Sequence, residues 1–148
     1  MNDHTSTAIQ TDSVMELLVA QCADLETLLT LARRETAAVE QSDFKAIMQI
    51  VGERATLGER LEVYHLQIAE MRRRMSDSVE LALGSPPATR ALELAVDIQT
   101  QDTRTHRLLT AAREEAAAAL SRLDRGRRSI TGYLRDPRPA AVACDQRI

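Results

Sequence analysis

The chain has 148 residues, of which 44% are hydrophobic and 28% charged, and its net charge is −3; this composition indicates a folded domain and not a disordered chain. Aromatic residues make up only 2%, and there are five Gly and four Pro, which disfavours a β-sheet fold and an enzyme with a deep pocket. Nucleic-acid binding is also disfavoured, because the chain lacks a basic excess and stacking aromatics.

The N-terminal part of the sequence predicts a flexible segment followed by a long helix. Residues 1–11 are polar and aperiodic, whereas residues 13–40 carry apolar residues with heptad spacing, as in a coiled coil. Asp12 or Ser13 can cap this helix, and Glu16 stands three residues after Ser13, as in a capping box. The seam consists of Leu18, Cys22, Leu25, Leu29, Ala32, Thr36 and Val39, and Leu17, Leu28 and Leu31 widen it toward a second neighbouring helix.

A second helix is predicted over about 43–80. It follows a break at 41–43, where Ser42 or Asp43 can act as the N-cap. Its periodicity fades near residue 75, so the segment 76–83 fits either a continued helix or a looser stretch. The predicted apolar face consists of Phe44, Ile47, Val51, Leu57, Leu61, Tyr64, Ile68, Met71 and Met75.

A third helix is predicted over 86–134, after the clearest boundary in the sequence. Gly84 suits the position that follows a helix, Ser85 suits an N-cap, and Pro86 suits the first helical position. The segment 99–107 interrupts the apolar face with polar residues, and 135–148 is predicted to be a flexible tail. The expected apolar positions are Leu92, Ala95, Val96, Ile98, Leu108, Leu109, Ala112, Ala116, Leu120, Leu123, Ile130 and Leu134.

These three helices predict an all-α fold with a single helical domain over 12–134. Short connections make consecutive helices antiparallel, which gives an elongated antiparallel three-helix bundle, or a coiled-coil-like helical hairpin with a long third helix. The third helix is longer than the first, so its neighbours cannot cover its whole length. A homo-oligomer that forms through this uncovered part is one expectation.

The sequence contains no recognisable catalytic or cofactor-binding constellation. Glu62 and His65 have the spacing of one ligand pair of a di-iron bundle, but no second pair exists, so an exposed polar face is the better interpretation. Cys22 and Cys144 are expected to be free thiols in a reducing cytoplasm. We therefore expect no enzyme activity, no cofactor and no metal, and neither a signal peptide nor a transmembrane segment.

The end of the third helix carries the candidate partner-binding residues. An apolar stripe continues there after an Ala-rich stretch, at a point where the other helices have ended. Such a stripe either packs in the core or binds an external helix, and the arginines around it suit an acidic protein partner or a solvated face. The candidate residues are Leu120, Leu123, Ile130, Tyr133 and Leu134.

Two stretches of the sequence resemble the FlgN family of flagellar type III export chaperones. Residues 35–73 resemble that family's junction of the first two helices, with a polar break, a short apolar pair and then Leu57 and Leu61 on a charged helix. Residues 105–134 resemble its last helix, in which a leucine pair follows a polar residue and a tyrosine, here Tyr133, closes the helix.

The resemblance implies a cytoplasmic chaperone of the bacterial flagellum that is not an enzyme. Such chaperones bind C-terminal helical segments of hook-filament junction proteins, keep them soluble and deliver them to the membrane export gate of the type III protein export apparatus. The resemblance also implies that Tyr133 contacts the export gate. The alternatives are a filament-cap-type flagellar chaperone and a structural or regulatory coiled-coil protein without an export role, with a helical di-metal enzyme as a remote third.

Overall fold

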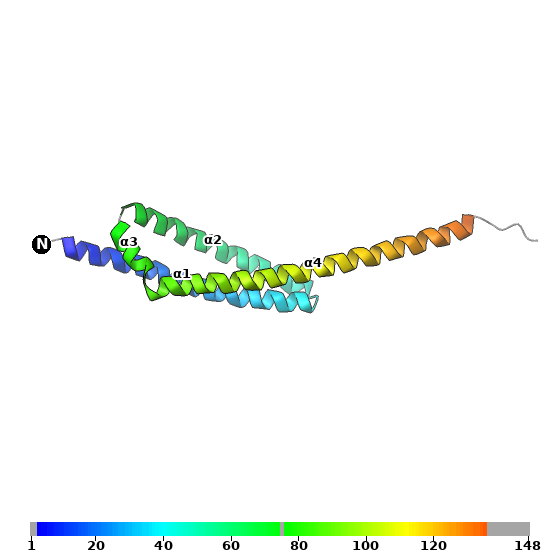
Figure 1. The fold of residues 1–148 in the computed structure, drawn as a ribbon, viewed down its shortest axis with the longest axis horizontal. Helices are drawn as coiled ribbons and strands as arrows, with labels where there is room; N and C mark the ends of the chain where they lie inside the picture. The colour runs from blue at the N-terminus through cyan, green and yellow to red at the C-terminus, as the bar shows by residue number, and fades with distance from the viewer. Residues whose placement is uncertain (1–2, 75, 136–148) are drawn as a thin grey trace, which may run out of the picture. The chain divides into compact units, whose positions relative to one another are not determined.

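The structure, a computed structural model, describes residues 3–74 and 76–135, and these form helices and no strand (Figure 1). The prediction of an all-α fold is thereby confirmed. The helices are α1 (Asp3–Glu40), α2 (Phe44–Arg74), α3 (Ser76–Leu83) and α4 (Pro86–Arg135). The chain divides into two compact units, unit 1 (Met1–Leu109) and unit 2 (Thr110–Ile148). The predicted flexible tail lies outside the described residues apart from Arg135.

Helix α1 begins ten residues earlier than expected, so Ser13 lies inside the helix and does not cap it. The segment 3–12 contains neither Gly nor Pro, and nothing in it stops a helix from extending toward the N-terminus. In the described part of the chain, no helix has an apolar stretch of the length and hydropathy that a membrane span requires.

The connection between α1 and α2 consists of a C-terminal capping motif of α1 followed directly by the N-cap of α2. The amide of Asp43 donates to the carbonyl of Ala38 at 2.9 Å and that of Ser42 to Val39 at 3.1 Å, the pair of bonds that defines a Schellman motif. Ser42 has φ of 56°, the left-handed conformation this motif requires. The side chain of Asp43 then accepts the amide of Ala46 at 3.0 Å, so Asp43 is the N-cap of α2.

The predicted second helix is divided in the structure, because α2 ends at Arg74 and a separate short helix, α3, covers residues 76–83. Val79 and Ala82 of α3 are fully buried against Val14 and Leu18 of α1, and Met71 of α2 packs on the same cluster. Burial of these side chains against α1 accounts for the separate helix, which lies between the end of α2 and the start of α4 (Figure 1).

Helix α4 starts at Pro86, as the sequence predicts. The two residues before it, Gly84 and Ser85, do not have the roles that the sequence suggested. Gly84 does not have a positive φ, so it is not a left-handed helix stop. The hydroxyl of Ser85 donates back to the carbonyl of Ala82, and its own carbonyl accepts the amide of Thr89 at 3.2 Å. Ser85 therefore joins the end of α3 to the first turn of α4.

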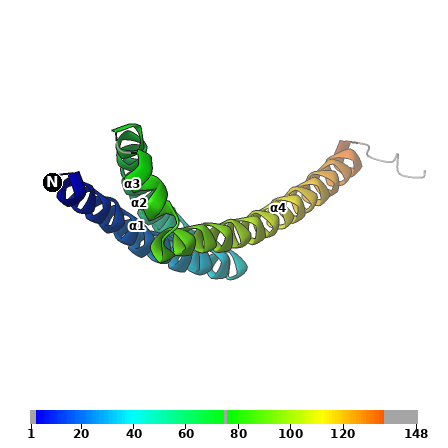
Figure 2. The ribbon, with the colours of Figure 1, turned by 60° about the vertical axis from the view of Figure 1, so that its left-hand side comes forward.

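In unit 1, α1 is the central helix and contacts two neighbours along its length (Figures 1 and 2). Arg54 pairs with Glu35, and Arg60 pairs with Asp24, so α2 runs antiparallel to α1. Two further clusters hold these helices together: Leu31, Ala38, Ile50 and Leu57 join α1 to α2, and Leu29, Leu94 and Ile98 join α1 to α4.

The first half of α4 runs parallel to α1, as the third helix of an up-down-up bundle must. The thiol of Cys22 lies 3.0 Å from the carbonyl oxygen of Pro87, and Thr36 contacts Gln101 at 3.4 Å. Both pairs are separated by 65 residues, so the two helices keep one register along their shared length. The prediction that α1 touches two neighbours is therefore confirmed.

Candidate partner-binding surface

Unit 2 presents all five candidate partner-binding residues to solvent. Its described part is the helical segment 110–135, and these described residues include no second element against which an apolar side could be buried. The exposed fractions run from 64% to 83%, so the structure shows none of them as core residues. They are Leu120, Leu123, Ile130, Tyr133 and Leu134.

Four of these residues form one row, which we call the stripe: Leu120, Leu123, Ile130 and Leu134. Their separations of three, seven and four residues follow the alternation of three and four that places side chains on one side of a helix. Tyr133 directly precedes Leu134, so helical geometry turns it by about 100° away from that neighbour. Tyr133 is therefore not a member of the row, although it follows Ile130 by three residues and lies beside it at the edge of the stripe.

An arginine occupies the position that completes the row. Arg127 stands four residues after Leu123 and three before Ile130, where the 3-4 alternation calls for an apolar residue. Its neighbour Arg128 pairs with Asp124 at 2.8 Å, but no carboxylate among the described residues forms an ion pair with Arg127. The stripe thus carries a positive charge in its middle. Sequence reasoning had placed the arginines only at its edges.

Two glycines lie in the same helical segment, Gly126 and Gly132. A Cβ atom added at either position would meet nothing within 4 Å, so neither glycine is needed to avoid a clash. Glycine in a helix interior is less favourable than alanine by about 1 kcal/mol. The stripe therefore lies on a helix that is weakened at two points.

No protein-family model, curated protein or solved structure matches the chain. The resemblance to the FlgN family stays a prediction from the sequence. The fold and the exposed stripe rest on the structure itself.

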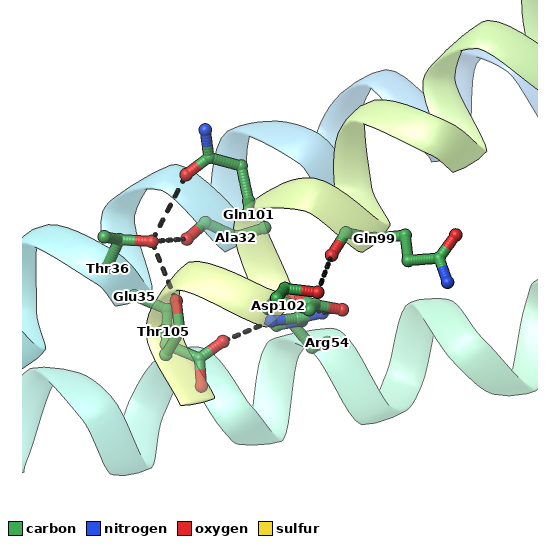
Figure 3. Close-up of polar contacts among 9 residues, drawn as sticks. Ala32, Glu35, Thr36, Arg54, Gln99, Gln101, Asp102 and Thr105 are labelled. Carbon is green, nitrogen blue, oxygen red and sulfur yellow. Dashed lines mark hydrogen bonds and ion pairs between the residues drawn. The ribbon is translucent and has the colours of Figure 1, made fainter. Parts of the chain in front are cut away.

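A polar layer crosses unit 1 where the sequence of α4 turns polar (Figure 3). The hydroxyls of Thr36 and Thr105 lie 2.8 Å apart in a buried position between α1 and α4. Arg54 of α2 donates to Glu35 and, at 2.8 Å, to both carboxylate oxygens of Asp102. Desolvation lowers the pKa of Arg54, but its hydrogen bonds with Asp102 and Glu35 outweigh this and raise it. The layer joins α1, α2 and α4 through polar groups that all have partners, which indicates a structural role.

Replacing Arg54 with Ala is expected to lower the free energy of unfolding by about 2 kcal/mol, because Glu35 is buried and would lose its partner. Chemical denaturation followed by circular dichroism measures this loss. Arg34→Ala is the control, since the Arg34–Glu53 pair is exposed and 3.8 Å long and should contribute less than about 0.5 kcal/mol. Equal losses in the two variants would contradict a structural role for the layer.

A second apolar surface of unit 1 is a groove of about 1090 Å³ between α1 and α2. Leu17 from α1 and Val63, Leu66 and Met71 from α2 line it, together with Glu70 and other polar residues. Sequence reasoning missed this groove, because Val63 and Leu66 lie outside the apolar face predicted for α2. The signal available in the sequence was the spacing of Val63 and Leu66 by three residues, which places both on one side of α2.

The described residues show no cluster of metal ligands, and Cys22 is not activated as a nucleophile. They contain no group of three or more His, Cys, Asp or Glu side chains that could hold a metal ion, and Glu62 and His65 are both exposed. Burial, followed by the charge of Glu26, raises the pKa of the Cys22 thiol above its ordinary value, although Arg90 opposes this. A protonated thiol is a poor nucleophile. Cys144 lies outside the described residues.

Proposed function

We propose that the chain is an export chaperone without enzyme activity, which binds an amphipathic helix of its partner protein along the stripe. The observation that carries this proposal is the exposure of Leu120, Leu123, Ile130 and Leu134 on one side of a helical segment. Exposed apolar rows of this kind are the usual docking site for a helix that buries its own apolar side.

The sequence resemblance supplies the identity of the partner in this proposal. The partner is the C-terminal helical segment of a flagellar hook-filament junction protein, which the chaperone keeps soluble in the cytoplasm and delivers to the export gate. Residues 35–73 and 105–134 carry that resemblance, and the second stretch contains the whole stripe. An unassembled subunit exposes amphipathic helices that would self-associate, and a bound chaperone covers them.

Capture experiments test the proposal directly. The purified full chain is immobilised and offered C-terminal segments of hook-filament junction proteins and, in parallel, segments of filament-cap proteins. Capture of the junction segments is expected, and capture of the filament-cap segments alone would support the alternative chaperone type. Capture of neither would contradict an export role and favour a structural coiled-coil protein.

Replacing Tyr133 with Ala is expected to leave partner binding unchanged and to reduce export of the partner. Tyr133 is 83% exposed and lies at the edge of the stripe without belonging to its row, so it is available for a transient contact with the export gate. Binding is measured by calorimetry and export by the amount of partner outside the cell. Weakened binding in this variant would instead make Tyr133 part of the helix-binding surface.

A further inference from the structure

Arg127 gives the stripe a chemical requirement that an apolar surface alone would not have. It stands in the row between Leu123 and Ile130, so any helix that covers both of these apolar neighbours also covers the guanidinium. A guanidinium that loses its water on binding is best compensated by a carboxylate that pairs with it, and no described carboxylate forms an ion pair with Arg127.

A second arginine, Arg113, repeats this arrangement two heptads before Arg127. It stands three positions before Ala116, which itself precedes Leu120 by four. It is exposed, and no ion pair joins it to another described residue. The row thus reads arginine, three apolar residues, arginine and two apolar residues at 3-4 spacing: Arg113, Ala116, Leu120, Leu123, Arg127, Ile130 and Leu134.

We infer that the occupant of the stripe is an acidic amphipathic helix with two carboxylates in its apolar seam, spaced by two heptads so that they face Arg113 and Arg127. This inference rests on the proposed function and names the chemistry of the partner. Charge complementarity supports it, because the segment 113–135, which carries the whole row, contains six arginines against three acidic residues. A parallel pairing with a second copy is disfavoured, because in register Arg127 would face Arg127.

Synthetic peptides of four heptads test the inference with the full chain. All have leucine at the seam positions, and the first carries two seam glutamates spaced by two heptads. In the second, one of these glutamates is exchanged with the next leucine along the seam, which shortens the spacing. The two probes have the same composition and net charge, so general electrostatic attraction cannot distinguish them. A third probe has an all-leucine seam. Affinities are measured by fluorescence anisotropy.

The probe with two-heptad spacing is expected to bind at least tenfold more tightly than either of the others. In the Arg127→Glu variant this preference is lost, and a probe with lysine at the facing position binds more tightly than its glutamate counterpart. Arg122→Glu is the matched control, because it makes the same charge change outside the row and should keep the preference for two-heptad spacing.

The other outcomes separate the inference from the proposed function. Equal binding of the two glutamate probes, or tighter binding of the all-leucine probe, would overturn the inference while the stripe remains the docking site. If no probe binds, the proposed docking function of the stripe fails as well. If light scattering shows a dimer of the free chain that Leu123→Asp dissociates, the occupant is a second copy and the inference is wrong.

Discussion

Replacing Leu123 with Asp is expected to weaken binding of the partner helix at least tenfold while the chain stays folded. Burial of one leucine contributes roughly 1.5–3 kcal/mol, and about 1.4 kcal/mol corresponds to a factor of ten in affinity. Leu123 is 71% exposed in unit 2, so the substitution removes no contact with a core. Calorimetric titration with junction-protein C-terminal segments measures the effect, and circular dichroism verifies the helix content.

Leu92→Asp is the matched control for this substitution. Leu92 lies on the same helix, α4, and is also 71% exposed, but it belongs to unit 1 and not to the stripe. The Leu92→Asp variant should bind the partner as tightly as the unsubstituted chain does. If Leu123→Asp together with Ile130→Asp binds normally, the stripe is not the site. A loss of binding in Leu66→Asp instead would move the site to the groove between α1 and α2.

Replacing Leu94 with Ala should lower the free energy of unfolding by about 3 kcal/mol, because truncation of a buried leucine removes its contacts and leaves a cavity. Leu94 is fully buried, with 0% exposure, and packs against Leu29 and Ile98. Substitutions of this kind cost about 2–5 kcal/mol. Urea denaturation of the full chain, followed by circular dichroism, gives the difference directly.

The comparison variant is Leu120→Ala, which makes the same truncation on the same helix. Leu120 is exposed in unit 2, so this change should alter the free energy of unfolding by no more than about 0.5 kcal/mol. A large loss for Leu120→Ala would show that the stripe packs internally, and that result would also argue against its proposed role in binding.

The high helical content was predictable from the sequence, but the sides of α2 and α4 that face α1 were not. Predicted apolar faces included Val51 and Leu92, whereas the structure buries Ile50 and Leu94 and leaves those two residues exposed. Apolar residues occur on several sides of α2 and α4, so periodicity alone fits more than one rotation. The buried side is chosen by which residues meet α1, and that contact depends on tertiary packing.

The polar segment 99–107 shows a second limit of sequence reasoning. It was predicted as an interruption of the apolar face, yet Asp102 and Thr105 are the α4 members of the layer that joins the three helices. Their partners, Arg54 and Thr36, lie 48 and 69 residues away in sequence. Local pattern cannot pair residues at such separations. The length comparison between helices predicted that part of the last helix would be uncovered, but it left open whether the stripe packs in the core, and only the structure places it in solvent.

In the proposed complex, Gly126 and Gly132 influence how tightly the stripe holds its partner. Each glycine lowers the stability of the helix by about 1 kcal/mol relative to alanine, so wherever the segment unfolds in the free chain, part of the binding free energy is used to make it helical again. For a segment that becomes helical only on binding, two such positions would lower the affinity by roughly thirtyfold relative to alanine, and this is the largest effect they can have. Since neither site is sterically restricted, the same chain with alanine there would retain its partner longer. The proposed export role requires release of the partner, and a shorter lifetime of the complex would suit that role.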